Sequence, residues 1–373
     1  MKICLIGPTY PFRGGISHYT TLLYRHLRKR HKVFFFAFKR QYPKFLFPGE
    51  TDKDNSVAPL REHGVENILD SVNPLSWMVV AMKIKKLNPD LIILPWWVVF
   101  WAPQFWTIVS MAKMLTRSKV LFICHNVVEH ESNILKKVTT KVVLKKGDYF
   151  IVHSAEDFDN LKRIKNSASI RRNFHPTYEV FRSEPIAKET ARSILSIRGN
   201  TILFFGFVRP YKGLSYLIEA LPLIQQHIDV NLLIVGEFWK DEDSYQQQIE
   251  RLGITDRVSI INEYIPNEKV PLFFAAADVA VLPYTSATGS GIVQIAFGCH
   301  KPVVTTTVGC LPEVVTDGKT GYLVPPKDPS ALADAVVRFY KNGKEVEFAE
   351  NIIAEKAKFS WDRMRETIES FYT

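Results

Sequence analysis

The chain has 373 residues, more than one hydrophobic core usually holds, so its length predicts two domains. Hydrophobic residues make up 46% and charged residues 23%, which excludes a disordered or fibrous chain. The net charge of +10 arises in the first 180 residues, where 28 Lys and Arg face 14 Asp and Glu. This basic half suggests a polyanionic or membrane-surface partner, with a merely solvated surface as the alternative. No recognised nucleic-acid module is present, so nucleic acid is not an expected partner.

Strand and helix patterns alternate from the N-terminus onward. Residues 2–7 form an apolar run typical of a buried strand, and residues 18–30 follow with apolar side chains on one helical face. The same reasoning predicts strands at 33–38, 91–94, 120–124 and 149–152, and helices at 77–86 and 158–165. This alternation favours a parallel sheet covered on both faces.

The most apolar stretch, residues 91–109, comes close to the length that spans a membrane. Pro95 and Pro103 interrupt it, so we predict a buried strand followed by an interfacial or core helix, with a transmembrane span as the alternative. The N-terminal apolar run is too short for a signal peptide, and the four cysteines lack zinc-site spacing. We therefore expect a cytoplasmic protein.

The periodic pattern stops near residues 173–178 and starts again with a strand at 201–205. Further strands are expected at 232–235, 258–261, 279–282 and 302–305, and helices at 214–221, 244–252, 267–276 and 291–297. We predict two Rossmann-like doubly wound domains, 1–178 and 179–373, with the final helix as a candidate to pack back on the first domain. Ligands of such sheets bind beyond the carboxyl ends of the strands, so the cleft between the domains is the expected site.

Two loops combine glycines with a following helix. Gly14 and Gly15 follow the first strand, and Thr288, Gly289, Ser290 and Gly291 precede the predicted helix 291–297. Backbone amides at a helix start can hold a phosphate, because glycines permit close approach and the helix dipole favours an anion. The first loop lacks the G-x-G-x-x-G dinucleotide fingerprint, and a plain turn or a linker is the alternative for each.

Two further segments carry charged or titratable side chains. Arg209 and Lys212 stand three residues apart on the loop after the strand 201–205, where they could neutralise a diphosphate leaving group. His125 ends the strand 120–124 and is followed by Glu129, His130 and Glu131. The spacing of the two histidines is not that of a helical zinc site, so no metal is expected.

These segments resemble the retaining glycosyltransferases of family 4, which have the GT-B fold. The resemblance spans nearly the whole chain. Its matching pieces are Gly14-Gly15, His125-Asn126, Val152-His153-Ser154, the Arg209 and Lys212 loop, Ala276-Ala277-Asp278-Val279, Leu282-Pro283, Lys301-Pro302-Val303-Val304, Leu311-Pro312-Glu313-Val314-Val315 and Gly321-Tyr322-Leu323-Val324.

The resemblance implies a nucleotide-diphosphate sugar held mainly by the second domain, with no metal or other cofactor. Arg209 and Lys212 would bind its diphosphate, and His125 would contact the transferred sugar. The further candidate donor contacts are Gly14, Gly15, Gly236, Glu237, Tyr264, Thr288, Gly289, Ser290, Gly291 and Gln294. Front-face attack, with the leaving phosphate accepting the acceptor's proton, would require no protein nucleophile.

The sequence departs from the family pattern at the two glutamates, eight positions apart, that contact the donor. Ala287 and Ile295 occupy those positions, and Gln294 with nearby hydroxyls is the candidate replacement. Phe207 stands where many members have an arginine, and Cys310 replaces a common glycine. Donor identity is therefore not defined by the motif, and a catalytically degenerate nucleotide-sugar-binding module remains an alternative.

The implied function is sugar transfer to a glycan or lipid-linked acceptor in cell-surface polysaccharide or glycolipid synthesis. The basic first domain would serve the acceptor and contact the anionic inner face of the membrane through Arg25, Arg28, Lys29, Arg30 and exposed aromatic side chains. A nucleotide-sugar 2-epimerase is the alternative enzyme, but the missing carboxylates argue against it.

Overall fold

The computed structural model describes residues 1–43, 51–127, 134–182, 186–239 and 241–372. The chain divides into two compact units. Unit 1 comprises Met1–Asn55, Pro59–Phe174 and Trp361–Thr373, and unit 2 comprises Ser56–Ala58 and His175–Ser360. The C-terminal helix therefore belongs to the unit built by the first part of the chain.

Unit 1 contains a seven-stranded parallel sheet with the order β3-β2-β1-β4-β5-β6-β7. Its strands are β1 (Lys2–Gly7), β2 (Lys32–Arg40), β3 (Val65–Asp70), β4 (Leu91–Trp96), β5 (Lys119–Cys124), β6 (Tyr149–Val152) and β7 (Ser169–Arg172). Its helices are α1 (Gly15–Leu27), α2 (Pro74–Leu87), α3 (Ala102–Leu115), α4 (Ile134–Leu144), α5 (Ala155–Ile164) and α14 (Trp361–Glu369).

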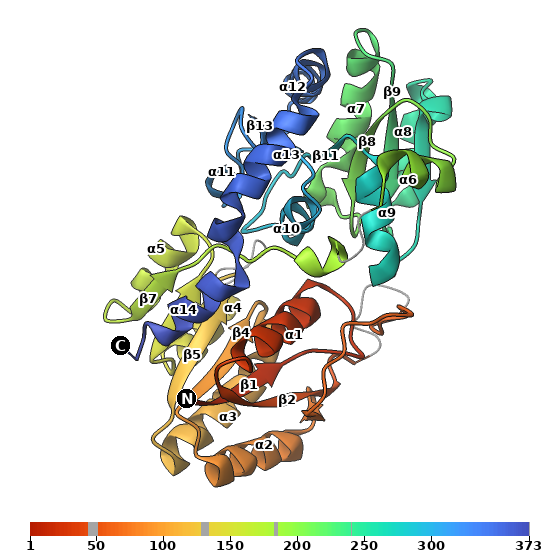
Figure 1. Ribbon diagram of the computed structural model, residues 1–373. Coiled ribbons are helices and arrows are strands. Elements are labelled where there is room, and N and C mark those ends of the chain that lie inside the picture. Colours follow the sequence, from red (N-terminus) through yellow and green to blue (C-terminus); the bar gives the residue numbers. More distant parts are fainter. Residues whose placement is uncertain (44–50, 128–133, 183–185, 240, 373) are drawn as a thin grey trace. The chain divides into compact units, whose positions relative to one another are not determined.

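Helices cover both faces of this sheet. Figure 1 shows α1 and α14 together on one face, and α2 and α3 on the other. Local signals fix several helix ends: the Asn73 side chain accepts a hydrogen bond from the Leu75 amide, Pro74 starts α2, and Asn88 ends it in the left-handed conformation. Ser154 caps α5 in the same way by accepting from the Asp157 amide.

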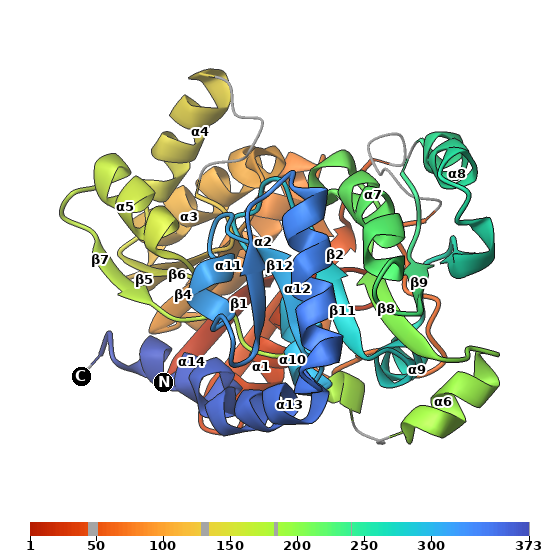
Figure 2. The same ribbon diagram turned by 90° about the horizontal axis from the view of Figure 1, so that it is seen from above.

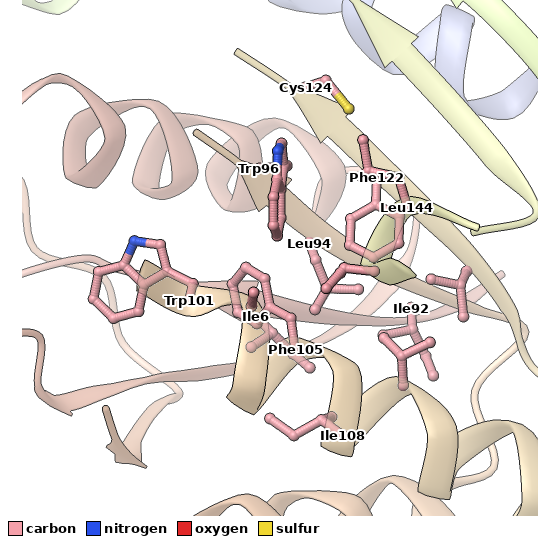
Figure 3. Packing of buried hydrophobic residues seen from close by; sticks show 14 of the residues in the cluster. Ile6, Ile92, Leu94, Trp96, Trp101, Phe105, Ile108, Phe122, Cys124 and Leu144 are labelled. Carbon is pink, nitrogen blue, oxygen red and sulfur yellow. The ribbon is translucent and has the colours of Figure 1, made fainter. Parts of the chain in front are cut away.

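The core of unit 1 lies between the central strands and α3. Ile92, Leu94 and Trp96 of β4 point toward Phe105 and Ile108 of α3, and all five are buried (Figure 3). The apolar stretch 91–109 thus forms β4, a 3₁₀ turn at Val99–Trp101 and the first half of α3. None of the helices in the described ranges combines the length and apolar character needed to span a bilayer.

Unit 2 contains a six-stranded parallel sheet with the order β10-β9-β8-β11-β12-β13. Its strands are β8 (Asn200–Phe205), β9 (Val230–Val235), β10 (Val258–Ile261), β11 (Val279–Leu282), β12 (Val303–Thr306) and β13 (Gly321–Val324). Its helices are α6 (Lys188–Ile194), α7 (Leu214–Gln225), α8 (Glu242–Arg251), α9 (Val270–Ala276), α10 (Gly291–Gly298), α11 (Leu311–Val314), α12 (Pro329–Lys341) and α13 (Lys344–Glu355).

Both sheets have the doubly wound order in which the first strand lies in the middle. In unit 2, β8 lies between β9 and β11, so the loops that follow these three strands start at the same sheet edge. Figure 2 shows β8, β9 and β11 side by side in this sheet. The predicted α/β class with two Rossmann-like sheets is confirmed.

Candidate active site

The loop between β8 and α7 carries Arg209 and Lys212. Gly206 follows β8 with a φ of 98°, and its amide donates to the Val235 carbonyl at 2.8 Å. A side chain on Gly206 would lie 3.1 Å from the Lys212 Nζ, so the glycine leaves room for the ammonium. Gly213 has a φ of 71°, and an ideal Cβ built on it would lie 1.9 Å from the Pro283 carbonyl oxygen. Only glycine fits this contact.

Lys212 is a buried cation, with 7% of its surface exposed. Burial, followed by the charge of Arg209, lowers the pKa of its ammonium group to about 7. Within the described ranges no carboxylate forms an ion pair with this ammonium, and the ring of Tyr284 lies 6.0 Å from Nζ. A buried cation without a protein anion is suited to an anionic ligand.

Arg209 lies against two aromatic rings, one on its own loop and one on the loop after β9. Its guanidinium carbon is 3.9 Å from the ring centroid of Trp239 and 5.4 Å from that of Phe207. A cation–π contact of this kind helps to hold a guanidinium in place. Trp239 therefore positions the predicted diphosphate ligand Arg209.

The loop after β9 is joined closely to the loop after β8. The Val208 amide donates to the Glu237 carbonyl at 2.9 Å, and Gly236 has a φ of 144°. An ideal Cβ on Gly236 would lie 2.3 Å from the Gly206 carbonyl oxygen, so only glycine allows this approach. Tyr264 lies in the loop that follows β10 and is half-buried.

The loop after β11 ends in the N-terminus of α10. Ser290 is the N-cap residue, and its hydroxyl accepts from the Val293 amide at 3.2 Å and lies 3.1 Å from the Tyr284 hydroxyl. Thr288 and Gly289 precede the cap, and Gly291 is the first residue of the helix. The Thr285 amide donates to the Tyr211 carbonyl at 2.8 Å, which joins this loop to the Lys212 loop. The amides of the first turn of α10 form a suitable anion site.

The positions of the missing glutamates lie on this same segment. Ala287 is buried and Ile295 is half-buried, so neither supplies a polar contact. Gln294 is 1% exposed, and its Oε1 has no hydrogen-bond partner within the described part of the chain. A buried amide oxygen in this state is suited to a ligand donor group. Cys310 fits beside Gly289, with its sulfur 3.6 Å from an ideal Cβ there.

Unit 1 contributes the other predicted residues. Gly14 is the N-cap of α1 with a φ of 106°, and its carbonyl accepts from the His18 amide at 3.1 Å. An ideal Cβ on Gly14 meets no atom within 4 Å, so the start of α1 is open on that side. Gly15 is the first residue of the helix, one turn before Tyr19.

His125 follows β5 and lies in an aromatic cluster. Its ring centroid is 4.5 Å from that of Tyr19 in an edge-on contact and 5.0 Å from that of His153. The His153 Nδ1 lies 2.7 Å from the Asn173 carbonyl and donates to it, and burial lowers the pKa of this imidazole to about 4. The ring of Trp361 from α14 packs 5.1 Å from Tyr19. His125 is thus held by α1, β6 and, through Tyr19, the C-terminal helix.

The structure assembles the predicted residues within each unit. In unit 2 the loops bearing Arg209 and Lys212, Gly236 and Glu237, and Thr288 to Gly291 are joined by hydrogen bonds. In unit 1, Tyr19 links the α1 glycines to His125. Val128, Glu129, His130 and Glu131 lie outside the described residues. The described ranges contain no group of three or more His, Cys, Asp or Glu side chains arranged to hold a metal ion.

Sequence reasoning missed Trp239 and Tyr19 as supporting residues. Trp239 follows β9 closely, and this position at the carboxyl end of a central strand was an available signal. Tyr19 falls on the apolar face of the helix predicted at residues 18–30, and that pattern does not indicate its contact with His125.

Comparison with known proteins agrees with this architecture. The model of the family described as glycosyl transferases group 1 matches residues 199–342, within unit 2. A D-inositol 3-phosphate glycosyltransferase from Mycobacteroides abscessus is 29% identical over 245 residues, covering 64% of this chain and 54% of that protein. The chain therefore spans about half the length of this relative.

Solved structures share the two-sheet architecture. Sucrose-phosphate synthase from Thermosynechococcus elongatus superimposes with a TM-score of 0.76 at 19% identity, covering 100% of this chain and 98% of that one. HepE from Anabaena in complex with UDP also gives a TM-score of 0.76, at 21% identity, with 100% and 99% covered. The fold is GT-B. The match to the group 1 glycosyltransferase family covers residues 199–342, most of unit 2.

Proposed function

We propose that this protein transfers a sugar, with retention of anomeric configuration, from a nucleotide-diphosphate sugar to a glycan or lipid-linked acceptor. The observation that carries the proposal is the buried Lys212 ammonium, which has no protein carboxylate as a counterion in the described ranges. Arg209 stands three residues before it, and the loop is hydrogen-bonded to the segment that starts α10. Two cations and a helix N-terminus suit a diphosphate that departs with its charge.

The donor nucleotide is a uridine or related diphosphate in this proposal. The support is the group 1 family match in unit 2 and the solved HepE structure, which contains UDP. We propose that Gln294 replaces one missing glutamate by accepting a hydrogen bond from the donor sugar, because its buried Oε1 has no partner among the described residues.

Retention is proposed to proceed without a protein nucleophile or a metal. His125 would contact the transferred sugar, and the departing phosphate would take the acceptor's proton. Arg209 and Lys212 would stabilise the charge that develops on that phosphate. Addition of EDTA should then leave the initial rate of donor turnover unchanged.

The acceptor proposal rests on the basic composition of the first half of the chain. A lipid-linked or membrane-borne acceptor would bring the protein to the anionic inner face of a membrane, in cell-surface polysaccharide or glycolipid synthesis. Two of the arginines considered for this contact have an intramolecular partner, since Arg25 and Arg28 both pair with Glu62 at 2.6 and 2.8 Å. Their charge is therefore partly compensated.

The test combines binding and turnover. A panel of nucleotide sugars is screened by thermal shift, and the best donor is assayed for nucleotide release and sugar transfer. Lys212→Ala should abolish the donor-induced shift and Arg209→Ala should reduce it, while Arg257→Ala, which changes an exposed arginine paired with Asp229, should retain it. A donor shift of wild-type size in Lys212→Ala would overturn the assigned diphosphate site.

Product analysis separates the alternatives. A 2-epimerase would convert the donor sugar without any acceptor, and a degenerate binding module would show a thermal shift without nucleotide release. Transfer to an acceptor with an unchanged anomeric configuration is the expected outcome.

A further inference from the structure

Three consecutive helices of unit 1 form one surface. α3 packs against both α2 and α4, and these helices lie on the face of the seven-stranded sheet opposite α1 and α14 (Figures 1 and 2). α3 and α4 connect neighbouring parallel strands, and α2 crosses from β3 to β4 over β2 and β1. Each helix therefore has one side on the sheet and one side turned away from it.

The outer side of α4 is apolar. Ile134 is 83% exposed, Leu135 73%, Val138 53% and Val142 48%. With 3.6 residues per turn, these four positions fall within an arc of about 100°. The buried residues of the helix, Thr140, Val143 and Leu144, occupy the opposite arc. The helix therefore presents a second apolar stripe to solvent in addition to the stripe that faces the core.

α2 repeats this arrangement. Its exposed apolar residues Leu75, Met78, Val79 and Met82 follow the i, i+3, i+4, i+7 spacing of one helical face, with exposed fractions between 39% and 65%. The side opposite to them holds the buried Val80, Ala81 and Ile84. Between the two helices, α3 adds the exposed Trp106 and Met114.

All charged side chains within these three helices are lysines, of which Lys83 and Lys113 pair with Glu66 and Asp148 of neighbouring segments at 2.7 and 2.8 Å. α2, α3 and α4 contain no Asp or Glu within their bounds, while α2 and α4 carry three lysines each. Lys85 and Lys86 end α2, and Lys137 and Lys141 flank the apolar stripe of α4 on one side. Lysines beside an exposed apolar stripe are characteristic of a helix that lies in a membrane interface.

We infer that the outer faces of α2, α3 and α4 form the surface by which unit 1 binds an anionic lipid membrane. The apolar side chains enter the boundary between headgroups and acyl chains, and the lysines bind the headgroup phosphates. The absence of acidic residues from these helices favours this occupant over a second copy of the chain, because two such surfaces would bring lysines together. The inference assigns the membrane contact to these helices rather than to the arginines of α1.

Membrane binding by this surface does not depend on the proposed transfer reaction; only its use for bringing the enzyme to a lipid-linked acceptor rests on that function. Donor binding measured without vesicles separates the two. A stripe variant that keeps the donor-induced thermal shift but loses vesicle binding supports the surface, whatever the reaction proves to be.

The test is flotation with vesicles of phosphatidylcholine containing phosphatidylglycerol, compared with phosphatidylcholine alone. The variant Ile134→Ser/Leu135→Ser/Val138→Ser should bind anionic vesicles at least about tenfold more weakly than wild type. The variant Lys137→Glu/Lys141→Glu should bind anionic vesicles more than about twentyfold more weakly than wild type, at about fivefold per lysine. Its binding to neutral vesicles should change little. The control Val346→Ser/Ile353→Ser removes exposed apolar residues from α13 of unit 2 and should bind as wild type does.

Three results would overturn the inference. The first is wild-type flotation by the α4 stripe variant. The second is an equal loss in the α13 control, which would indicate a nonspecific effect of surface hydrophobicity. The third is sedimentation showing a dimer that the stripe variant dissociates, together with no vesicle binding by the wild type.

Discussion

Lys212 gives donor binding a specific dependence on pH. Burial and the charge of Arg209 lower its pKa to about 7, so the free protein loses this positive charge as the pH rises through neutrality. Both phosphates of a nucleotide-diphosphate sugar are esterified and stay anionic over this range. The donor therefore binds the protonated lysine and raises its pKa back toward the ordinary value.

The magnitude follows from proton linkage. The donor Kd should be constant well below pH 7 and should rise about tenfold per pH unit above it, until the pH reaches the pKa of the bound state. Between pH 7 and 9 the Kd is expected to rise about 50-fold, because about half of the lysine is already deprotonated at pH 7. In Lys212→Arg the cation stays protonated, so the Kd should vary little over this range. Arg209→Ala should move the break to higher pH, because a charge that lowers the Lys212 pKa is removed.

Isothermal titration calorimetry from pH 6 to 9 at constant ionic strength measures this dependence. Repeating the titration in buffers of different ionisation enthalpy counts the protons taken up, which should approach one above pH 7. A Kd for the wild type that is flat between pH 7 and 9 would refute the reasoning. An equally steep dependence in Lys212→Arg would assign the titration to another group.

Further predictions concern the loops around the site. Trp239→Ala should raise the donor KM about two- to fivefold by releasing Arg209, and Trp239→Phe should recover most of the loss in the same nucleotide-release assay. Gly236→Ala should lower the free energy of unfolding in urea by about 2–3 kcal/mol, because the added Cβ would meet the Gly206 carbonyl. The control Gly253→Ala, where nothing lies within 4 Å of the added Cβ, should lower this free energy by less. Equal losses of stability in the two variants would contradict the argument from this contact. Ser290→Ala should cost about 1 kcal/mol through loss of the α10 cap, whereas Ser290→Thr should keep it, both measured by the same unfolding experiment.

The central strands were predictable because both of their faces are buried. Residues 3–6 of the predicted strand 2–7 are all apolar, and the structure has a strand with the same bounds, Lys2–Gly7. The edge strands β3 and β7 were missed, since Val65–Asp70 and Ser169–Arg172 mix polar and apolar residues. An edge strand needs less apolar surface, so its signal resembles that of a loop. The first helix ends at Leu27 rather than Arg30, because residues 28–30 add charge without an apolar face.

The site was predictable where its residues are close in sequence. Arg209 and Lys212 share one loop, so their proximity followed directly from spacing. The contact of Trp239 with Arg209 could not be predicted from sequence spacing. It depends on the register that pairs Phe205 with Val235 and so places the two following loops together. The burial of Lys212 likewise results from packing of three loops around Gly206 and Gly213.

The position of α14 affects how the protein is made and how it can be divided. Trp361 packs on Tyr19, and the Thr367 hydroxyl lies 3.1 Å from the Asn173 side chain, so unit 1 is completed by residues that the ribosome adds after all of unit 2. During synthesis, the α1 side of the sheet in the first 174 residues stays partly uncovered until α14 has been made. A fragment ending at Phe174 would keep that exposed surface permanently. A soluble unit 1 should therefore be built by joining residues 361–372 to Phe174 through a short linker rather than by simple truncation.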